Sequence, residues 1–154
     1  MNQFSASISN GIKAAHDARV NISEIRAVIA EISEAVDQLT DGKIAIFHQR
    51  IPVIGSNVIS DFIGAFADLQ KDDVLSFKRT SPPLEAIEIG RLEIPSSGYP
   101  CSVKFAGKKM ACFDRASLVT ILQELLSTPD AGKALLKLRE MPDKKDEPVR
   151  PATG

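Results

Sequence analysis

A run of isoleucines near the N-terminus keeps a seven-residue rhythm, and it constrains the fold more than any other feature of the chain. Successive members are alternately three and four residues apart: Ile22, Ile25, Ile29, Ile32, Val36 and Leu39. This spacing places them on one face of an α-helix and is typical of a helix that packs along another helix. The rhythm continues more weakly upstream, through Ile8, Gly11, Ala15 and Ala18. The pattern predicts a helix over residues 5–39 whose role is to pack against another helix rather than to catalyse a reaction.

The predicted helix is longer than the domain that should carry it. At 1.5 Å per residue it extends about 50 Å, whereas a compact domain of this chain length is only about 40 Å across. Asn21 and Glu24 form a capping-box-like pair in the middle of the run, but neither Gly nor Pro supports a break there, so we expect a continuous helix. Gly42 suits the left-handed position that ends a helix. The helix must therefore overhang, bend or find a partner.

The middle of the chain alternates in the manner of strands. Residues 43–53 predict a strand that ends near Pro52, and residues 74–79 and 84–94 predict two more. In the last of these, Ile87 and Ile89 alternate with polar or small residues, as in a half-buried strand. Between them, residues 58–69 predict a short amphipathic helix.

Residues 101–112 predict a β-hairpin, and the sequence allows two registers for its strands. A turn at Gly107-Lys108 is favoured, because Gly suits the first central position of a two-residue turn, and it places Val103 opposite Cys112. A turn at Ala106-Gly107 would instead bring Cys101 directly opposite Cys112. The first register makes the two sulfurs diagonal neighbours, and the second would bring them within reach of a disulfide.

Two helices follow the hairpin. Asp114 is a good N-cap for the first, and Thr128 with Pro129 begins the second, which should bury Leu135, Leu136 and Leu138. Residues 142–154 lack apolar content and predict a disordered tail. We therefore expect one α+β domain over residues 1–141, with a long N-terminal helix, a mainly antiparallel sheet of about four to five strands and two C-terminal helices.

Composition and charge limit the functions that this chain can have. Lys and Arg number 19 against 20 Asp and Glu, for a formal net charge of -1. That balance argues against a dedicated nucleic-acid binder and does not discourage self-association. No apolar stretch is long enough to span a bilayer, and no basic segment followed by an apolar run marks a secretory signal. We expect a cytoplasmic protein without a membrane partner.

The residues that carry catalytic chemistry are scarce and scattered. Cys101, Cys112 and His48 are the only polar candidates for a small enzyme or ligand-binding site, and no signature joins them. Neither a zinc pattern nor a phosphate-binding loop is present, so we expect no metal and no cofactor. Cations at the hairpin tip, which a nucleic-acid accessory protein could use, are more typical of a solvated strand edge: Lys104, Lys108, Lys109 and Arg115.

The helix face remains as the leading functional feature. It predicts a non-enzymatic protein–protein interaction module, such as an adaptor, inhibitor or immunity-type binder, whose partner is another protein or a second copy of the chain. The expected contact residues are those of the rhythm, although the same face could pack on the protein's own sheet: Ile8, Ala15, Ala18, Ile22, Ile25, Ile29, Ile32 and Val36. The overhanging first half, with Ile8, Ala15 and Ala18, is where we expect the partner to bind.

Overall fold

The computed structural model of the chain describes residues 2–48 and 73–143. Within these residues, three helices and five strands follow one another in the order α1 (Gln3–Thr40), β1 (Ile44–His48), β2 (Val74–Arg79), β3 (Ala86–Glu93), β4 (Cys101–Phe105), β5 (Lys108–Cys112), α3 (Arg115–Leu126) and α4 (Pro129–Glu140). The predicted α+β fold is confirmed. The helix predicted over residues 58–69 and the last part of the strand predicted over residues 43–53 lie outside the described residues.

Helix α1 is continuous for 38 residues, as expected at Asn21. The Asn2 side chain caps its start by accepting a hydrogen bond from the Phe4 amide at 2.8 Å. Asp41 ends it in the left-handed region with φ 53°, and Gly42 follows with φ 76°. The left-handed conformation expected at Gly42 thus begins one residue earlier, at Asp41. Aspartate adopts this conformation more readily than most residues.

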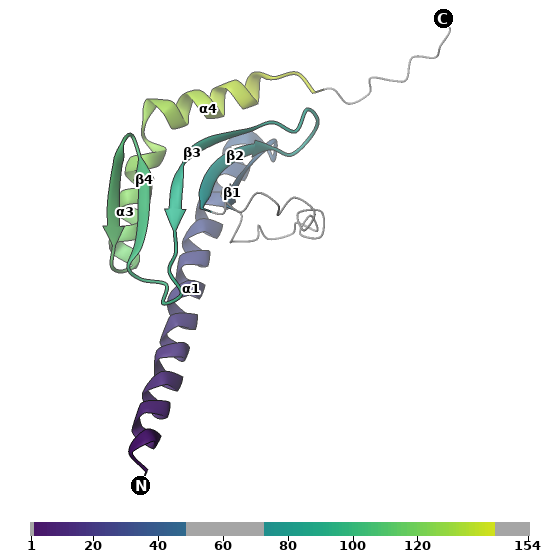
Figure 1. Cartoon of the computed structure of the whole chain (residues 1–154). Coiled ribbons are helices and arrows are strands. Elements are labelled where there is room, and N and C mark those ends of the chain that lie inside the picture. Colours follow the sequence, from purple (N-terminus) through teal and green to yellow (C-terminus); the bar gives the residue numbers. More distant parts are fainter. Residues whose placement is uncertain (1, 49–72, 144–154) are drawn as a thin grey trace, which may run out of the picture.

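The five strands form one antiparallel sheet in the order β1-β2-β3-β4-β5. The described helices α1, α3 and α4 lie on the same face of this sheet (Figure 1). Helix α1 contacts β1 and α3, α3 contacts β4 and β5, and α4 contacts β1, β2 and β3. Short connections join β2 to β3, β3 to β4 and β4 to β5, and consecutive strands joined in this way leave one face of the sheet for the helices to cover.

The core lies between the sheet and the helices. In β1, β2 and β4, alternate residues point toward the helices and are buried, as the two-residue period of a strand requires. They are Ile44, Ile46, His48, Leu75, Phe77, Arg79, Cys101, Val103 and Phe105. The C-terminal half of α1 contributes Ile25, Val28, Ile29 and Val36 to the same core.

A register shift between Leu75 and Ser76 changes which residues of β3 point inward. Leu75 pairs with Gly90 while Ser76 pairs with Glu88, so Ile89 is the extra residue of a bulge. Gly90 and Leu92 are therefore buried, whereas Ile87 and Ile89 are only half-buried. A Cβ at Gly90 would lie 2.7 Å from Leu125 Cδ1 and 2.9 Å from the backbone carbonyl oxygen of Lys104. Because the backbone of the neighbouring strand cannot easily move, only glycine fits beneath α3 at this point.

The hairpin adopts the less favoured of its two predicted registers. Cys101 pairs directly with Cys112, and the turn is Ala106-Gly107. Ala106 and Gly107 have φ of 52° and 76°, the left-handed conformations that a two-residue hairpin turn uses. The prediction of a Gly107-Lys108 turn was wrong because it considered only the preference for glycine in the first central position.

Helices α3 and α4 begin where predicted. Asp114 accepts a hydrogen bond from the Ser117 amide at 2.9 Å, and Thr128 accepts one from the Ala131 amide at 3.2 Å. Leu138 is buried as expected. Leu136 was wrongly expected in the core and is 46 % exposed; Ala131 and Ala134 are buried on the inner face instead.

A buried arginine ties the end of α4 to the sheet. Arg79 is 2 % exposed, and its guanidinium donates to the carbonyl oxygens of Leu138 at 2.9 Å and Met141 at 3.1 Å. It also donates to the Pro83 carbonyl at 2.9 Å and forms an ion pair with Asp143. The last carbonyls of a helix have no partner within the helix, and this side chain supplies one. Asp143 lies in the segment predicted to be a tail, whose remainder, residues 144–154, is outside the described residues.

We expect Arg79→Ala to lower the free energy of unfolding by about 1–3 kcal/mol. The variant leaves the buried Leu138 carbonyl oxygen and several part-buried carbonyl oxygens without their donor, and it removes the ion pair with Asp143. Urea denaturation measures the loss. Arg115→Ala is the matched control, since Arg115 forms an exposed ion pair with Glu31 and should cost under about 1 kcal/mol. Equal losses for the two variants would contradict this role of Arg79.

Candidate interaction surface

The first half of α1 projects away from the rest of the protein, and we refer to residues 3–20 as the arm. Figure 1 shows it extending as a bare helix beyond the sheet. Every residue of the arm is exposed except Ala18, which is half-buried. Isolated helices of this length are marginally stable in water, so the arm owes its helical form to its continuity with the anchored half of α1.

Three large apolar side chains are exposed at every fourth position of the arm. Phe4 is 61 % exposed, Ile8 63 % and Ile12 67 %. Residues four apart lie one above another on a helix, so the three form a continuous ridge, which we name the apolar ridge. Helices that face water on all sides seldom carry such a row, and an exposed row of this kind marks a contact surface.

Small residues continue the same face toward the domain. Gly11, Ala15 and Ala18 follow one another at spacings of four and three, which is the rhythm of the buried stripe downstream. A Cβ at Gly11 would meet nothing within 4 Å. The face is therefore bulky at its N-terminal end and shallow where it approaches the domain.

The domain begins to cover α1 at Asn21. The Asn21 side-chain amide donates to the Ser97 carbonyl oxygen at 3.1 Å, in the loop between β3 and β4. Gly98 in this loop has φ 90°, and a Cβ on it would lie 2.5 Å from the Asn21 Cβ. The loop thus passes against the helix at a glycine, and the boundary between the arm and the anchored half is sharp.

A second contact holds this boundary. The Tyr99 hydroxyl donates to Glu24 Oε1 at 2.7 Å. Burial and the facing Glu24 carboxylate raise the pKa of Tyr99 above its usual range, so the phenol keeps its proton and its hydrogen bond at physiological pH.

The predicted contact residues divide between the two halves of the helix. In the anchored half, Ile25, Ile29 and Val36 are buried in the protein's own core, with Ile22 and Ile32 half-buried against it. In the arm, the predicted residues Ile8 and Ala15 are exposed and Ala18 is half-buried. The alternative of internal packing thus applies to the anchored half.

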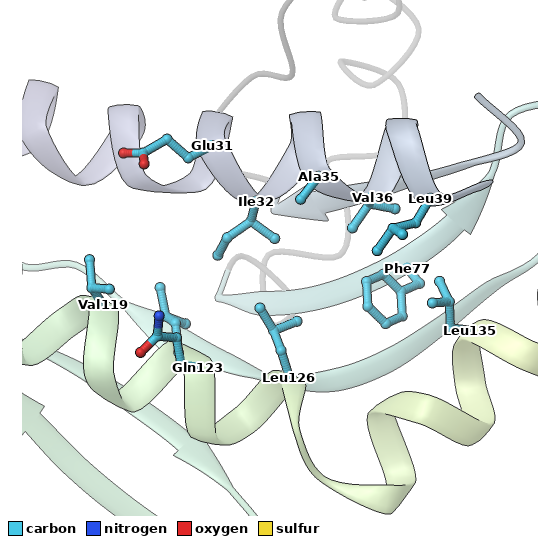
Figure 2. Close-up of a pocket in the computed structure, with 11 residues that line it drawn as sticks. Glu31, Ile32, Ala35, Val36, Leu39, Phe77, Val119, Gln123, Leu126 and Leu135 are labelled. Atoms are coloured by element: carbon cyan, nitrogen blue, oxygen red, sulfur yellow. The ribbon is translucent and has the colours of Figure 1, made fainter. Parts of the chain in front are cut away.

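A second apolar surface is a groove between α1 and the C-terminal helices. It encloses about 340 Å³. Figure 2 shows Ile32, Ala35 and Leu39 of α1 on one wall, facing residues of α3, with Phe77 at the base; the full lining is Glu31, Ile32, Ala35, Val36, Leu39, Phe77, Val119, Leu122, Gln123, Leu126 and Leu135. Leu39, predicted to belong to the stripe, is 73 % exposed at its rim.

The structure separates the candidate catalytic residues. His48 is buried on β1 and its Nε2 lies 2.8 Å from the Leu92 carbonyl oxygen. Cys101 and Cys112 pair with each other on β4 and β5, buried and not bridged. Strands β2 and β3 lie between this pair of strands and β1. Burial raises the pKa of the Cys101 thiol to about 12, and that of Cys112 is raised by the same cause. A thiol that keeps its proton is a poor nucleophile.

Two of the four cations near the hairpin tip pair with the protein's own carboxylates. Lys109 Nζ lies 2.9 Å from Glu93 Oε1, and Arg115 donates to Glu31 Oε2 at 2.7 Å. These pairs reduce the positive potential that a nucleic-acid backbone would meet.

Phe4 and Ile12 are contact candidates that the sequence interpretation missed. The seven-residue template selects Ile8, Gly11, Ala15 and Ala18 and passes over them. A search for apolar residues repeated at every fourth position would have found them, because Phe4, Ile8 and Ile12 form that series.

In comparisons with known proteins, no family model matches the chain, and neither a curated protein nor a solved structure matches it significantly. Among the helices that the structure describes, none combines the length and apolar content needed to cross a membrane. Within residues 2–48 and 73–143, no group of three or more His, Cys, Asp or Glu side chains could hold a metal ion.

The raised pKa of Cys101 predicts a pH dependence of stability. The unfolded chain loses this proton near pH 9 and the folded protein only near pH 12. The unfolded state therefore binds fewer protons between these values, and the free energy of unfolding falls as pH rises above about 9, by up to about 1.4 kcal/mol per pH unit for this thiol. Urea denaturation at several alkaline pH values measures the slope. Cys101→Ala should flatten it, and an unchanged slope in that variant would contradict this assignment.

Proposed function

We propose that this protein is a non-enzymatic protein–protein interaction module, an adaptor, inhibitor or immunity-type binder, that associates with a second copy through the arm. The observation that carries the proposal is the exposed apolar ridge of Phe4, Ile8 and Ile12. Removing such a side chain from water contributes about 1.5–3 kcal/mol. A helix that presents three of them in a row gains most by packing against another apolar surface.

The division of α1 determines which residues carry the contact. Ile25, Ile29 and Val36 already pack in the domain, so a partner would have to unfold the core to reach them. The partner therefore contacts the arm, including Ile8, Ala15 and Ala18. The anchored half of α1 holds the arm in place.

A non-enzymatic function agrees with the chemistry of the described residues. Both thiols keep their protons at neutral pH, and the ring of His48 is engaged with a backbone carbonyl oxygen. Two facing thiols that are not bridged are typical of a reducing compartment, so we also propose that the protein works in the cytoplasm.

The test is a charge placed on the apolar ridge. We expect the double variant Ile8→Asp and Ile12→Asp to be monomeric at concentrations where the wild type self-associates, as measured by size-exclusion chromatography with light scattering. Both positions are exposed, so the variant should keep its folded circular dichroism spectrum and its midpoint in urea.

Val20→Asp is the matched control. Val20 is 52 % exposed on the same arm, but helical spacing places it about 120° around the helix from Ile8, off the ridge. It should associate as the wild type does. A wild type that stays monomeric at every concentration would refute self-association, and equal losses in both variants would refute the assignment to the ridge.

A further inference from the structure

We infer that two arms pair in antiparallel orientation, so that the bulky end of each lies on the shallow end of the other. Phe4 of one copy then lies beside Ala18 of the second copy, and Ile8 beside Ala15. The twofold axis passes near Gly11 and Ile12. This inference rests on the proposed self-association and specifies its geometry.

The sizes of the side chains support this register. Along the contact face, the N-terminal half of the arm carries Phe4 and Ile8, while the C-terminal half carries Ala15 and Ala18. Antiparallel pairing sets each large side chain against a small one, which lets the helices approach closely and fill the space between them. Parallel pairing would set large against large at one end and small against small at the other, leaving a gap.

The position of the domain favours the antiparallel pair. From Asn21 onward the protein's own loop and core cover the side of α1 that adjoins the arm's contact face. In a parallel pair, both domains would lie at the same end of the helix pair and crowd the partner helix there. In the antiparallel pair the domains lie at opposite ends, and Phe4 of one copy reaches Ala18 just before the other copy's domain begins.

Charge favours the same orientation. Lys13 and Asp17 lie away from the contact face by helical spacing, whereas Arg19 borders it. Antiparallel pairing brings Arg19 of each copy beside Phe4 of the other, where a guanidinium stabilises an aromatic face. Parallel pairing would bring the two arginines together. The opposed helix dipoles add to the preference.

The size of the contact sets the expected strength. Eighteen residues extend about 27 Å, and one helix pair of that length lies at the lower end of the area that specific interfaces bury. The interface is isologous, so it closes at two copies and does not propagate. We therefore expect a dimer that dissociates in the micromolar range.

Single cysteines introduced along the arm test the register. The native Cys101 and Cys112 are fully buried, so the wild type serves as the control that does not react. In the proposed dimer, Gly11→Cys lies near the twofold axis and should cross-link to itself with a short bis-maleimide. Ser5→Cys and Ala18→Cys should cross-link when mixed but not alone, because like positions lie about 20 Å apart along the axis.

Each outcome decides between the geometries. Self-cross-linking of Ser5→Cys would show a parallel pair and overturn the inference. Cross-linking of Ile8→Cys with Leu39→Cys would place the arm in the groove of the other copy and overturn it as well. A dimer by light scattering without the Gly11→Cys product leaves the proposed function standing and refutes the register, whereas a monomeric wild type refutes both.

Discussion

The packing of the C-terminal half of α1 against the sheet orients the whole helix. Ile25, Val28, Ile29 and Val36 bury one face of α1 against the sheet and α3, and this contact orients all 38 residues of the helix. Burial of four such side chains contributes about 1.5–3 kcal/mol each, enough to fix the anchored half. Since a helix is stiff over this length, the anchored half also determines where the arm points.

The apolar side chains of α1 therefore have two uses along a single helix. From Asn21 onward, the β3–β4 loop and the core cover them, and they stabilise the domain. In the arm, nothing of the described chain covers Phe4, Ile8 and Ile12, which are exposed to water. The change from one use to the other occurs within one turn, at the contact between Asn21 and Gly98. The proposed function and the proposed dimer both follow from that sharp boundary.

The sequence predicted the fold class because its local signals agree with its tertiary structure. The isoleucine rhythm, the Asp114 and Thr128 caps and the alternation of residues 74–79 all correspond to observed elements. The length of the predicted helix, set against the expected size of the domain, already indicated an overhang. Period alone could not show where the domain stops covering the helix, because a buried and an exposed isoleucine have the same spacing.

Features that depend on residues distant in the chain could not be predicted from the sequence. The bulge at Ile89 exchanges the inward residues of β3, and it arises from pairing with β2. Arg79 is buried because carbonyl oxygens of α4, some sixty positions away, surround it, and a charged residue at the end of a strand gives no local sign of this. The hairpin register depended on a positive φ at Ala106, which alanine seldom adopts.

Hydrogen exchange of the full chain at low and high protein concentration distinguishes the anchored half of α1 from the arm. Amides of residues 25–40 should exchange slowly at both concentrations, because the core protects them. Amides of residues 5–20 should exchange fast when dilute and more slowly when concentrated, as the arms pair. If the arm amides are equally protected at every concentration, the chain itself protects them. If they still exchange fast at high concentration, no second copy covers them. Either result would contradict the proposed pairing of the arms.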